Sequence, residues 1–564
     1  MTLALGHRLR VLGGATRRAL PDQPVPEGPF LPTSSPGVLP GVLRDELVPV
    51  LAAAAAIGGP VAHGPFDPRA HALTIDLFRP GDVRPVWEQN RLAEIPTLAL
   101  AHRLDPEGGH LARAEAWLAR WCRANPGYRG PNWACAQEAS LRMLHLMLAH
   151  AILGGGAAAP GLRALATVHQ RRIAATRRYA EAQDNNHSIS EPAGLFACAL
   201  ALGEDAAPHG AALGRAVERL VGPDGGFAQV STVYHRLLLD VLSVAEWLRR
   251  TYALLPFPEP FPARAAAAAR WLLRLVDPTT GAVPLLGHGD GSRFADLSLC
   301  GATDVRGSAE RAARLFLRAS AGFAHDPGCR WLELPRPPVL RPEHRWTAEG
   351  SRGWNRDGAR LLLRTGPLIF RPGQSDLLHL DLWDGAVNLL RDGGTLSYNP
   401  PPEEREIALG LEDAAGHNTV VFDGAEPMPR AGRFLRARWP DTGELADGAW
   451  VRDHRGNRHA RRVSGLNRAW VVSDELAGPF RRAALRWRLA PAAWEMAAQG
   501  VRSPLGRISI SADAPLRLSL TQGWEAPRYG RRRPVPVLLA EAEAPVNWIV
   551  TLVRLPPRPG DAQA

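Results

Sequence analysis

The sequence predicts an α+β multidomain protein, in which an all-helical domain is followed by an antiparallel β-sandwich. Its 564 residues exceed what one hydrophobic core organises, so more than one domain is expected. Apolar residues recur with helical spacing from about residue 82 to 335. From about residue 341, short apolar runs separated by Gly, Asp and Pro replace this helical pattern.

Pro and Gly are frequent in residues 1–80, which predict a lead-in with one or two short helices. The helical domain is predicted over residues 81–338. One helical face there carries Leu111, Ala114, Leu118, Trp121 and Cys122. The same signal recurs at residues 264–276, and Gly- or Pro-containing breaks stand at 124–131 and 154–160. Antiparallel helix pairs of this length predict a bundle or toroid, and no G-x-G-x-x-G or Walker A loop is present.

The β-sandwich is predicted over residues 339–564. Its expected strands include residues 360–364, 366–370, 507–511, 516–520 and 548–555. Short strands punctuated by turn residues are typical of an antiparallel sandwich. The change of texture predicts the boundary between the two domains near residue 340.

The net charge is +11, from 67 Lys+Arg residues that are all arginine against 56 acidic residues. The arginines are scattered among the acids and the longest cationic run is Arg531–Arg533, so we expect no nucleic-acid partner. An acidic polysaccharide suits the same sign of charge. The five cysteines are widely spaced without a C-x-x-C pair, which predicts buried thiols rather than disulfides.

Residues 1–20 contain arginines but no uninterrupted apolar segment, so no standard secretory signal is visible. No charge-free apolar run is long enough to span a bilayer, and no transmembrane segment is expected. The absence of a signal favours the cytoplasm. The sequence leaves the oligomeric state open.

A polar cluster at residues 184–191, Asp-Asn-Asn-His-Ser-Ile-Ser-Glu, precedes an apolar helix expected at residues 193–202. Its Asn and His residues could cap that helix. Two Asn, a His and a Glu exceed what a cap needs, which favours a set of donors at a helix entrance aimed at an anion.

Two further clusters lie in the helical domain. Tyr234 and His235 end a loop before an expected helix at residues 236–248, where Tyr234 either packs or transfers protons. Glu138 and Arg142 are four residues apart and form either a surface ion pair or part of a sugar site. Trp133 precedes them as a candidate sugar-stacking platform.

The β half carries a candidate metal site. His379 and His417, with one carboxylate, would form a ligand set suited to Zn²⁺. Strand alternation places His379 and Asp381 on one face, so Asp381 competes with Asp392 for the carboxylate role. Histidines satisfied within a sheet are commoner than zinc sites.

Taken in order, these clusters resemble the heparinase II/III family of polysaccharide lyases, over about residues 82–423. The similar elements are a D-x-R-x-x-W-E-x-x-R segment at 82–91, N-N-H…E at 185–191, S-x-x-Y-H at 231–235 and H-N-T-V-V-F-D-G at 417–424. The resemblance implies an (α/α) toroid and a β-sandwich with the active cleft between them. It also implies β-elimination on a uronic-acid-containing, heparin/heparan- or alginate-like glycan, and an envelope or periplasmic location in a bacterium.

By the same resemblance, Asn186 and His187 would neutralise the uronate carboxyl group, and Tyr234 would be the base, the acid or both. The implied substrate-binding residues are Trp133, Glu138, Arg142, Glu191, His235, Tyr398 and Arg405. The implied metal ligands are His379, Asp392 and His417, which favours Asp392 over Asp381. The ion would be a structural Zn²⁺, because elimination needs no metal-bound hydroxide.

One position departs from the family pattern. Several members carry H-x-H, but Leu377 stands two residues before His379. We expect His235 or Tyr398 to supply the missing polar group. Two other functions stay open: a non-catalytic glycan-binding or polysaccharide-assembly protein, and a glycoside hydrolase whose two carboxylates would be Glu138 and Glu191.

Overall fold

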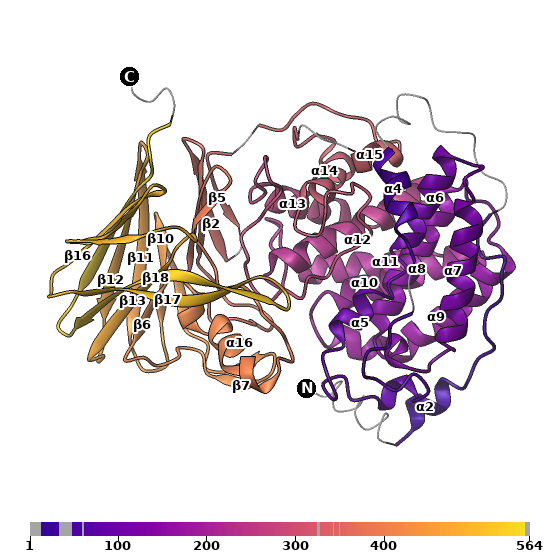
Figure 1. The fold of residues 1–564 in the computed structure, drawn as a ribbon, viewed down its shortest axis with the longest axis horizontal. Coiled ribbons are helices and arrows are strands. Elements are labelled where there is room, and N and C mark those ends of the chain that lie inside the picture. The colour runs from indigo at the N-terminus through magenta and orange to yellow at the C-terminus, as the bar shows by residue number, and fades with distance from the viewer. Residues whose placement is uncertain are drawn as a thin grey trace. The chain divides into compact units, whose positions relative to one another are not determined.

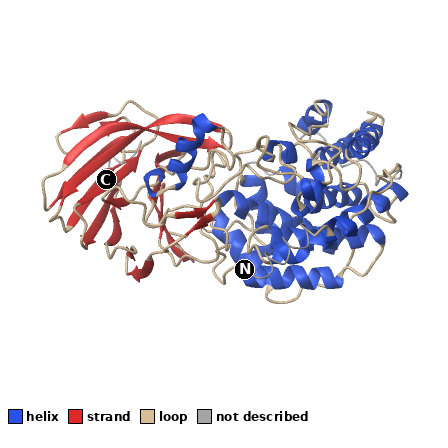
Figure 2. Ribbon diagram, turned by 90° about the horizontal axis from the view of Figure 1, so that it is seen from below, coloured by secondary structure: helices blue, strands red, loops and turns tan. Residues whose placement is uncertain are grey.

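A computed structural model of the protein describes residues 13–32, 48–58, 61–323, 327–341, 343–348 and 350–558. The chain divides into two compact units. The first comprises Met1–Gly225, Tyr234–Leu273 and Ser292–Leu340, and the second comprises Gly226–Val233, Arg274–Gly291 and Arg341–Ala564. The first unit is helical and the second consists mainly of strands (Figures 1 and 2). The prediction that no secretory signal is visible concerns residues 1–20. Residues 1–12 of this segment lie outside the described part of the chain.

The first unit is an (α/α) toroid, in which most of the long helices pack against a helix adjacent in sequence. Its helices are α2 (Ala15–Ala19), α4 (Val48–Ala55), α5 (Arg84–Glu88), α6 (Glu94–Leu104), α7 (His110–Ala124), α8 (Ala136–Ile152), α9 (Pro160–Glu181), α10 (His187–Leu202), α11 (Ala207–Leu220), α12 (Thr232–Thr251), α13 (Phe261–Leu273), α14 (Arg306–Ala312) and α15 (Pro327–Trp331). Short 3-10 turns η1 (Ala72–Thr74) and η2 (Pro131–Trp133) and a π-helical turn, η3 (Ala313–Leu317), complete it.

Packing in the toroid follows the apolar periodicity of its helices. The predicted face of α7 is buried except at Leu111, which is half-buried. Every residue of α8 is buried, so this helix lies in the middle of the unit. α10 crosses α8 closely, because a Cβ built on Gly194 would lie 2.4 Å from Cβ of Ser140. Glycine at this position therefore sets the distance between two helices that carry candidate site residues.

The second unit contains antiparallel sheets. Their strands are β1 (Arg345–Ala348), β2 (Ser351–Arg356), β3 (Ala359–Arg364), β4 (Leu380–Asp384), β5 (Val387–Leu390), β6 (Val420–Phe422), β7 (Arg430–Gly432), β8 (Leu435–Arg436), β9 (Asp441–Leu445), β10 (Gly448–Arg452), β11 (Arg458–Leu466), β12 (Ala469–Ala477), β13 (Arg482–Arg488), β14 (Glu495–Ala497), β15 (Gly500–Ser503), β16 (Gly506–Ala512), β17 (Arg517–Arg528), β18 (Arg531–Glu543) and β19 (Trp548–Arg554). The helical segments among them are η4 (Pro402–Glu404), α16 (Arg405–Glu412) and η5 (Ala414–Gly416).

Three sheets share one core, which makes this unit a β-sandwich. The strand orders are β1-β2-β3-β4-β5, β14-β15-β16-β19-β12-β11-β10-β9 and β17-β18-β13-β6, and β7 and β8 form a separate pair. Inward side chains from all three sheets, such as Leu363, Val472 and Leu538, belong to one buried cluster. Alternating burial along β12 and β19 produces this face, because successive side chains of a strand point to opposite sides.

The structure confirms four of the predicted strands as β3, β16, β17 and β19. The prediction of a strand at residues 366–370 is wrong, since this segment has no regular structure. Pro367 has no N–H to donate to a sheet, and Phe370 has a positive φ of 55°. The sequence shows Pro367, whereas the positive φ of Phe370 appears only in the structure.

The prediction of buried, free thiols agrees with the structure except at Cys300. All five cysteines are free, and all but Cys300 are buried. Within the described ranges, the search for a helix with the length and hydropathy of a membrane span finds none.

Candidate active site and metal centre

The first turn of α10 holds the Asn-Asn-His cluster. The helix starts at His187, earlier than predicted, with Asn186 as its N-cap residue. The Asn185 side-chain oxygen accepts a hydrogen bond from the backbone N–H of His187 at 3.0 Å, so capping uses Asn185 rather than the Asn186 side chain. The polar residues 187–191 and Pro192 belong to the helix, although the apolar run that predicted it begins only at residue 193.

His187 and Glu191 meet one turn apart on α10. Nδ1 of His187 lies 3.4 Å from Oε1 of Glu191, and the His187 side chain remains 22% exposed. Glu191 is buried beneath it and its Oε2 has no hydrogen-bond partner. Burial raises the pKa of Glu191, although His187 lowers it in part. The pair presents an imidazole oriented by a buried carboxyl group, which suits binding of an anion.

Tyr234 lies in the first turn of α12, which begins at Thr232 rather than at the predicted residue 236. Hydrogen bonds of the preceding residues fix this entrance: the Ser231 hydroxyl donates to the His288 carbonyl at 2.5 Å, and the Thr232 hydroxyl donates to the Pro284 carbonyl at 2.7 Å. The Tyr234 side chain is buried, with 5% of its surface exposed.

His235 faces the interior of the helical unit. Its Nε2 lies 2.8 Å from the carbonyl oxygen of Ala268, and its ring stacks on Trp271 with centroids 4.3 Å apart. Burial lowers the pKa of His235 to about 4, so the ring is neutral near pH 7. The structure gives His235 a core position instead of the expected substrate-facing one, because both its ring face and its nitrogen are already engaged.

Trp133 is also a core residue. Its Nε1 donates to the carbonyl of Asn125 at 3.1 Å, and its ring packs against Trp121, Tyr128 and His169. Only 1% of Trp133 is exposed, which corrects the expectation of a sugar-stacking platform.

Glu138 pairs with Arg91 and not with Arg142. Arg91 Nε and Nη2 donate to the two Glu138 oxygens at 2.7 and 2.8 Å. The side chains of Arg91, Glu138 and Arg142 are all buried. Arg142 instead points Nε at Nε2 of His169 and donates from Nη2 to the Asn132 carbonyl. The surface ion pair considered for Glu138 and Arg142 is therefore wrong.

Arg91 is a residue that the sequence analysis did not select for the site. It closes the D-x-R-x-x-W-E-x-x-R segment, and it also donates to Glu88 at 2.5 Å and to the Arg293 carbonyl at 3.1 Å. A buried bidentate arginine–carboxylate pair is a strong positional constraint. The sequence offered one signal for Arg91, which is its place at the end of that segment. Glu88 was the one nearby acid in the segment that could pair with it.

The three predicted metal ligands come together in the second unit. One donor atom from each of His379, Asp392 and His417 lies within 4.8 Å of the others, and all three side chains are buried. Nδ1 of His417 is 3.0 Å and Nε2 of His379 is 3.5 Å from Oδ2 of Asp392. Despite burial, the imidazoles hold the pKa of Asp392 below its usual value, and Asp392 raises the pKa of His417.

One ring nitrogen of each histidine faces the Asp392 carboxylate. The N–H of Asn418 donates to Nδ1 of His379 at 2.9 Å, which leaves the ring proton of a neutral His379 on Nε2. A metal ion would thus replace protons on both histidines. His417 Nε2 and Asp381 Oδ2 are also buried without hydrogen-bond partners. Two imidazoles and a carboxylate fit Zn²⁺ by donor type.

Asp381 is the more distant carboxylate. Its Oδ1 accepts hydrogen bonds from Trp383 at 2.5 Å and from Asn388 at 2.7 Å, and its Oδ2 is 3.8 Å from Nε2 of His379. Burial raises the pKa of Asp381, which favours its neutral form. These contacts leave Asp392 as the nearer candidate ligand.

Tyr398 and Arg405 lie in the second unit. The half-buried ring of Tyr398 contacts His288, Phe434 and Tyr529 with centroids 5.1–5.5 Å apart. Arg405 is exposed at the first position of α16. Neither residue is held in the metal cluster, and both remain predicted substrate contacts.

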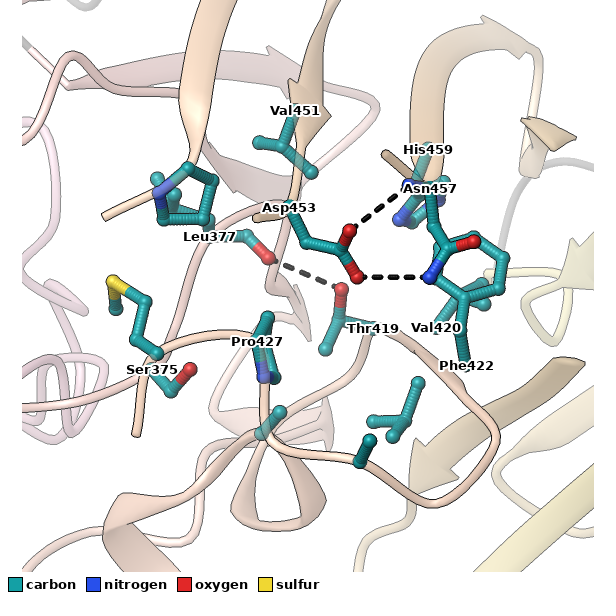
Figure 3. A pocket seen from close by; sticks show the side chains of 15 residues that line it. Ser375, Leu377, Thr419, Val420, Phe422, Pro427, Val451, Asp453, Asn457 and His459 are labelled. Carbon is teal, nitrogen blue, oxygen red and sulfur yellow. Dashed lines mark hydrogen bonds between the residues drawn. The ribbon is translucent and has the colours of Figure 1, made fainter. Parts of the chain in front are cut away.

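Leu377, which replaces a histidine of the family pattern, lines a small pocket of about 30 Å³ (Figure 3). Its carbonyl accepts a hydrogen bond from the Thr419 hydroxyl at 3.1 Å. His459, from β11, lines the same pocket, and its Nε2 is 2.7 Å from Asp474. The leucine is thus 93% buried against mostly apolar neighbours such as Val420.

Known proteins share part of this sequence and the architecture of the chain. Residues 344–552 match the family model described as heparinase II/III-like, C-terminal. A solved heparinase III shares 14% identity, with a TM-score of 0.62, over 92% of this chain and 84% of that chain. The heparan sulfate lyase HepC from Pedobacter heparinus shares 16% identity, with a TM-score of 0.56, over 96% and 87%.

A third similar structure is the chondroitin AC lyase of Streptomyces coelicolor A3, with 13% identity and a TM-score of 0.52 over 94% of this chain and 81% of that chain. A search of curated proteins by sequence returns no match. At these identities the solved structures establish a shared fold.

The fold thus defines a protein of the class that joins an (α/α) toroid to an antiparallel β-sandwich. Within that class, residues 344–552 carry a heparinase II/III-like C-terminal domain, and the fold that the resemblance implied is confirmed.

Proposed function

We propose that the protein is a polysaccharide lyase that cleaves a uronic-acid-containing, heparin/heparan- or alginate-like glycan by β-elimination. The observation that carries this proposal is the first turn of α10, where Asn186 and a partly exposed His187 stand above the buried Glu191. A proton-bearing imidazole and an amide at a helix N-terminus stabilise an anion, and a uronate carboxyl group becomes more negative during elimination. We also propose a bacterial periplasm or cell envelope as its location, which is what the family resemblance implies.

In the proposed reaction, the C5–H and C4–O bonds of the uronate break and a C4=C5 double bond forms. Asn186 and His187 hold the carboxyl group while charge develops on it, and Glu191 orients His187. Tyr234 takes the C5 proton, delivers a proton to the leaving glycosidic oxygen, or does both. The proton ends on that oxygen, so no oxidant or metal-bound water is needed.

Two alternatives differ in their products. A glycoside hydrolase would need Glu138 as one of its two carboxylates, but Arg91 outweighs the effect of burial and holds the pKa of Glu138 at about 2. A fully buried, ion-paired carboxylate is a poor acid or nucleophile for a sugar. A non-catalytic glycan-binding protein would bind a polyuronate without turnover.

We expect the protein to generate unsaturated uronides from at least one member of a panel of heparin, heparan sulfate, chondroitin and alginate. The measurement is the ultraviolet absorbance of the new double bond, with mass spectrometry of the products. Reducing ends without the double bond would identify a hydrolase. Binding without any product would favour the glycan-binding alternative and contradict the proposal.

We also propose that His379, Asp392 and His417 hold a structural Zn²⁺. Support comes from their donor types, their complete burial and the unpartnered nitrogen and oxygen atoms around them. When bound, the ion would supply a fixed positive charge among these buried groups. His379 precedes β4, Asp392 follows β5 and His417 follows η5. The ion would therefore join segments that are distant in sequence.

The metal prediction is tested by elemental analysis. The purified protein should contain about one zinc per chain, and chelation should lower its melting temperature by several degrees. Asp392→Asn should remove the zinc, whereas Asp453→Asn, in the same unit but outside the cluster, should retain it. Equal zinc content in both variants would contradict the assignment of Asp392.

A further inference from the structure

A buried arginine of the β-sandwich, Arg461 on β11, contacts the backbone beside two of the proposed zinc ligands. Its Nη1 donates hydrogen bonds to the carbonyls of Leu378 and Asn418, each at 2.6 Å. Leu378 directly precedes His379, and Asn418 directly follows His417. One guanidinium nitrogen thus joins the two segments that supply the histidines.

The remaining donors of Arg461 fix its orientation. Nε and Nη2 donate to the two carboxylate oxygens of Asp474 at 2.7 and 3.1 Å. Asp474 lies directly opposite Arg461 on the neighbouring strand β12, and both side chains are fully buried. The guanidinium carbon also lies 4.9 Å from the ring centroid of Trp487. A bidentate arginine–carboxylate pair has a defined geometry, so Nη1 is directed at the two carbonyls.

Asp474 is an ionised carboxylate in this pair. Although burial raises its pKa, Arg461 and His459 hold the pKa of Asp474 at about 2. Nε2 of His459 lies 2.7 Å from Oδ1 of Asp474. The charge of Arg461 is therefore neutralised through Nε and Nη2 alone. The two hydrogen bonds from Nη1 are additional to this ion pair and serve the backbone.

The two backbone segments lie just outside regular strands. Strand β4 begins at Leu380 and β6 begins at Val420, so Leu378 and Asn418 each stand two residues before a strand. Leu378 has a φ of 60°, a left-handed conformation that leucine rarely adopts. Such a backbone persists where its surroundings hold it in place. Arg461 is part of those surroundings, because the Leu378 carbonyl that it binds belongs to the peptide bond preceding the ligand histidine.

Asn418 connects Arg461 to the ring of His379. Its backbone N–H donates to Nδ1 of His379 at 2.9 Å, and its side-chain amide donates to the Leu380 carbonyl at 2.8 Å. Nε2 of His379 then lies 3.5 Å from Oδ2 of Asp392. A shift of Asn418 would therefore disturb the hydrogen bond that orients the imidazole. Hydrogen bonds of this kind around a metal site tune its affinity for the ion.

We propose that Arg461 is a positioning residue of the zinc site, which fixes the two backbone segments so that His379 and His417 face Asp392 before the ion binds. This inference rests on the proposed structural Zn²⁺ and extends it to a residue that would not touch the ion. Strands β4, β6 and β11 belong to three different sheets. The contacts of Arg461 therefore hold together three sheets of the sandwich at the cluster.

The test compares the zinc affinity of Arg461→Met with that of wild type. The full-length protein, freed of metal by chelation, is titrated with Zn²⁺ in competition with a chromophoric chelator at neutral pH. Arg461→Met should bind Zn²⁺ about 10–100-fold more weakly than wild type, the usual effect of losing a contact around the ligands. The measurement needs no glycan, so it is independent of the lyase activity.

Arg352→Met is the matched control. Arg352 is a buried arginine of the same unit, and it also donates to two carbonyls, those of Leu445 and Ala446, and to one carboxylate, that of Glu444. None of these contacts involves a segment of the metal cluster. Arg352→Met should therefore bind Zn²⁺ as tightly as wild type.

Loading with Co²⁺ gives a second readout. The visible absorption of protein-bound Co²⁺ reports the arrangement of ligands around the ion, which a loss of stability alone does not change. The spectrum of Arg461→Met should differ from that of wild type, whereas Arg352→Met should reproduce the wild-type spectrum. If Arg461→Met does not fold, Arg461→Lys and Arg352→Lys make the same comparison, because lysine lacks the fork that reaches a carboxylate and two carbonyls together.

A weaker zinc affinity or an altered Co²⁺ spectrum that is confined to the Arg461 variant supports the proposal. Wild-type affinity together with a wild-type spectrum in that variant would overturn it and leave the zinc assignment intact. An equal loss in the Arg352 variant would also overturn it, because general destabilisation would then explain both. A wild-type protein that binds neither ion would overturn the zinc assignment and this inference with it.

Discussion

Tyr234→Phe should lower the rate of polyuronate elimination by about 10³-fold, within the range of about 10²–10⁴ for loss of a general acid or base. The substitution removes only the hydroxyl group and keeps the aromatic ring that packs at the start of α12. The melting temperature should therefore change little, while the rate of double-bond formation falls. The ultraviolet assay on the best substrate of the panel measures both kcat and KM, and the loss should appear in kcat.

Tyr252→Phe provides the matched control. Tyr252 directly follows α12, and its hydroxyl is buried without a hydrogen-bond partner. The same chemical change there should leave elimination within about twofold of wild type, since surface and spectator changes have small effects. Equal activity of Tyr234→Phe and wild type would remove Tyr234 from the proposed reaction.

Glu138→Gln should lower the free energy of unfolding by about 3–5 kcal/mol, because it leaves the buried Arg91 without its main counter-ion. Among acidic side chains, Arg91 then retains Glu88 at 2.5 Å, which is partly exposed. Chemical denaturation at neutral pH measures the loss. A change below about 1 kcal/mol would show that the pair contributes no more than an exposed ion pair.

Acidity should have a related effect on the wild-type protein. The pKa of Glu138 is held at about 2, below its value in an unfolded chain, so its contribution to stability is complete above about pH 4.5. It is lost as the pH falls toward 2, and Glu138→Gln should flatten that part of the stability curve. Glu181→Gln is the control, because its pair with Arg177 at 2.9 Å is exposed and should be worth less than about 1 kcal/mol.

Periodicity predicted the fold more reliably than it predicted where elements begin. The face of α7 and the strand β19 follow directly from their apolar spacing. The start of α10 was misplaced because the apolar run begins at Ala193, whereas the helix extends back through Pro192 to His187. The start of α12 depends on hydrogen bonds to residues 284 and 288, which no local pattern reveals.

The family resemblance predicted that His379, Asp392 and His417 would lie together, but residue type overestimated the accessible surface of the helical site. His379, Asp392 and His417 come from separate segments and meet as expected. Trp133 and His235 are residue types that often bind sugars, yet both are buried. Burial arises from the packing of several helices, so a single helix pattern cannot distinguish a core tryptophan from an accessible one. The partner of Glu138 was missed for the same reason, because Arg91 is distant in sequence.

The path of the chain limits how the protein can be divided. The second unit includes residues 226–233 and 274–291, which leave and re-enter the helical part of the sequence. Within this unit, Arg360 of β3 pairs with Asp277 at 2.9 Å, and Thr395 accepts a hydrogen bond from the N–H of Gly289. A truncation near residue 340 would therefore yield a sandwich that lacks two of its own segments. A gene fusion or domain exchange at that junction would produce the same incomplete sandwich. The two units therefore have to be gained and lost together.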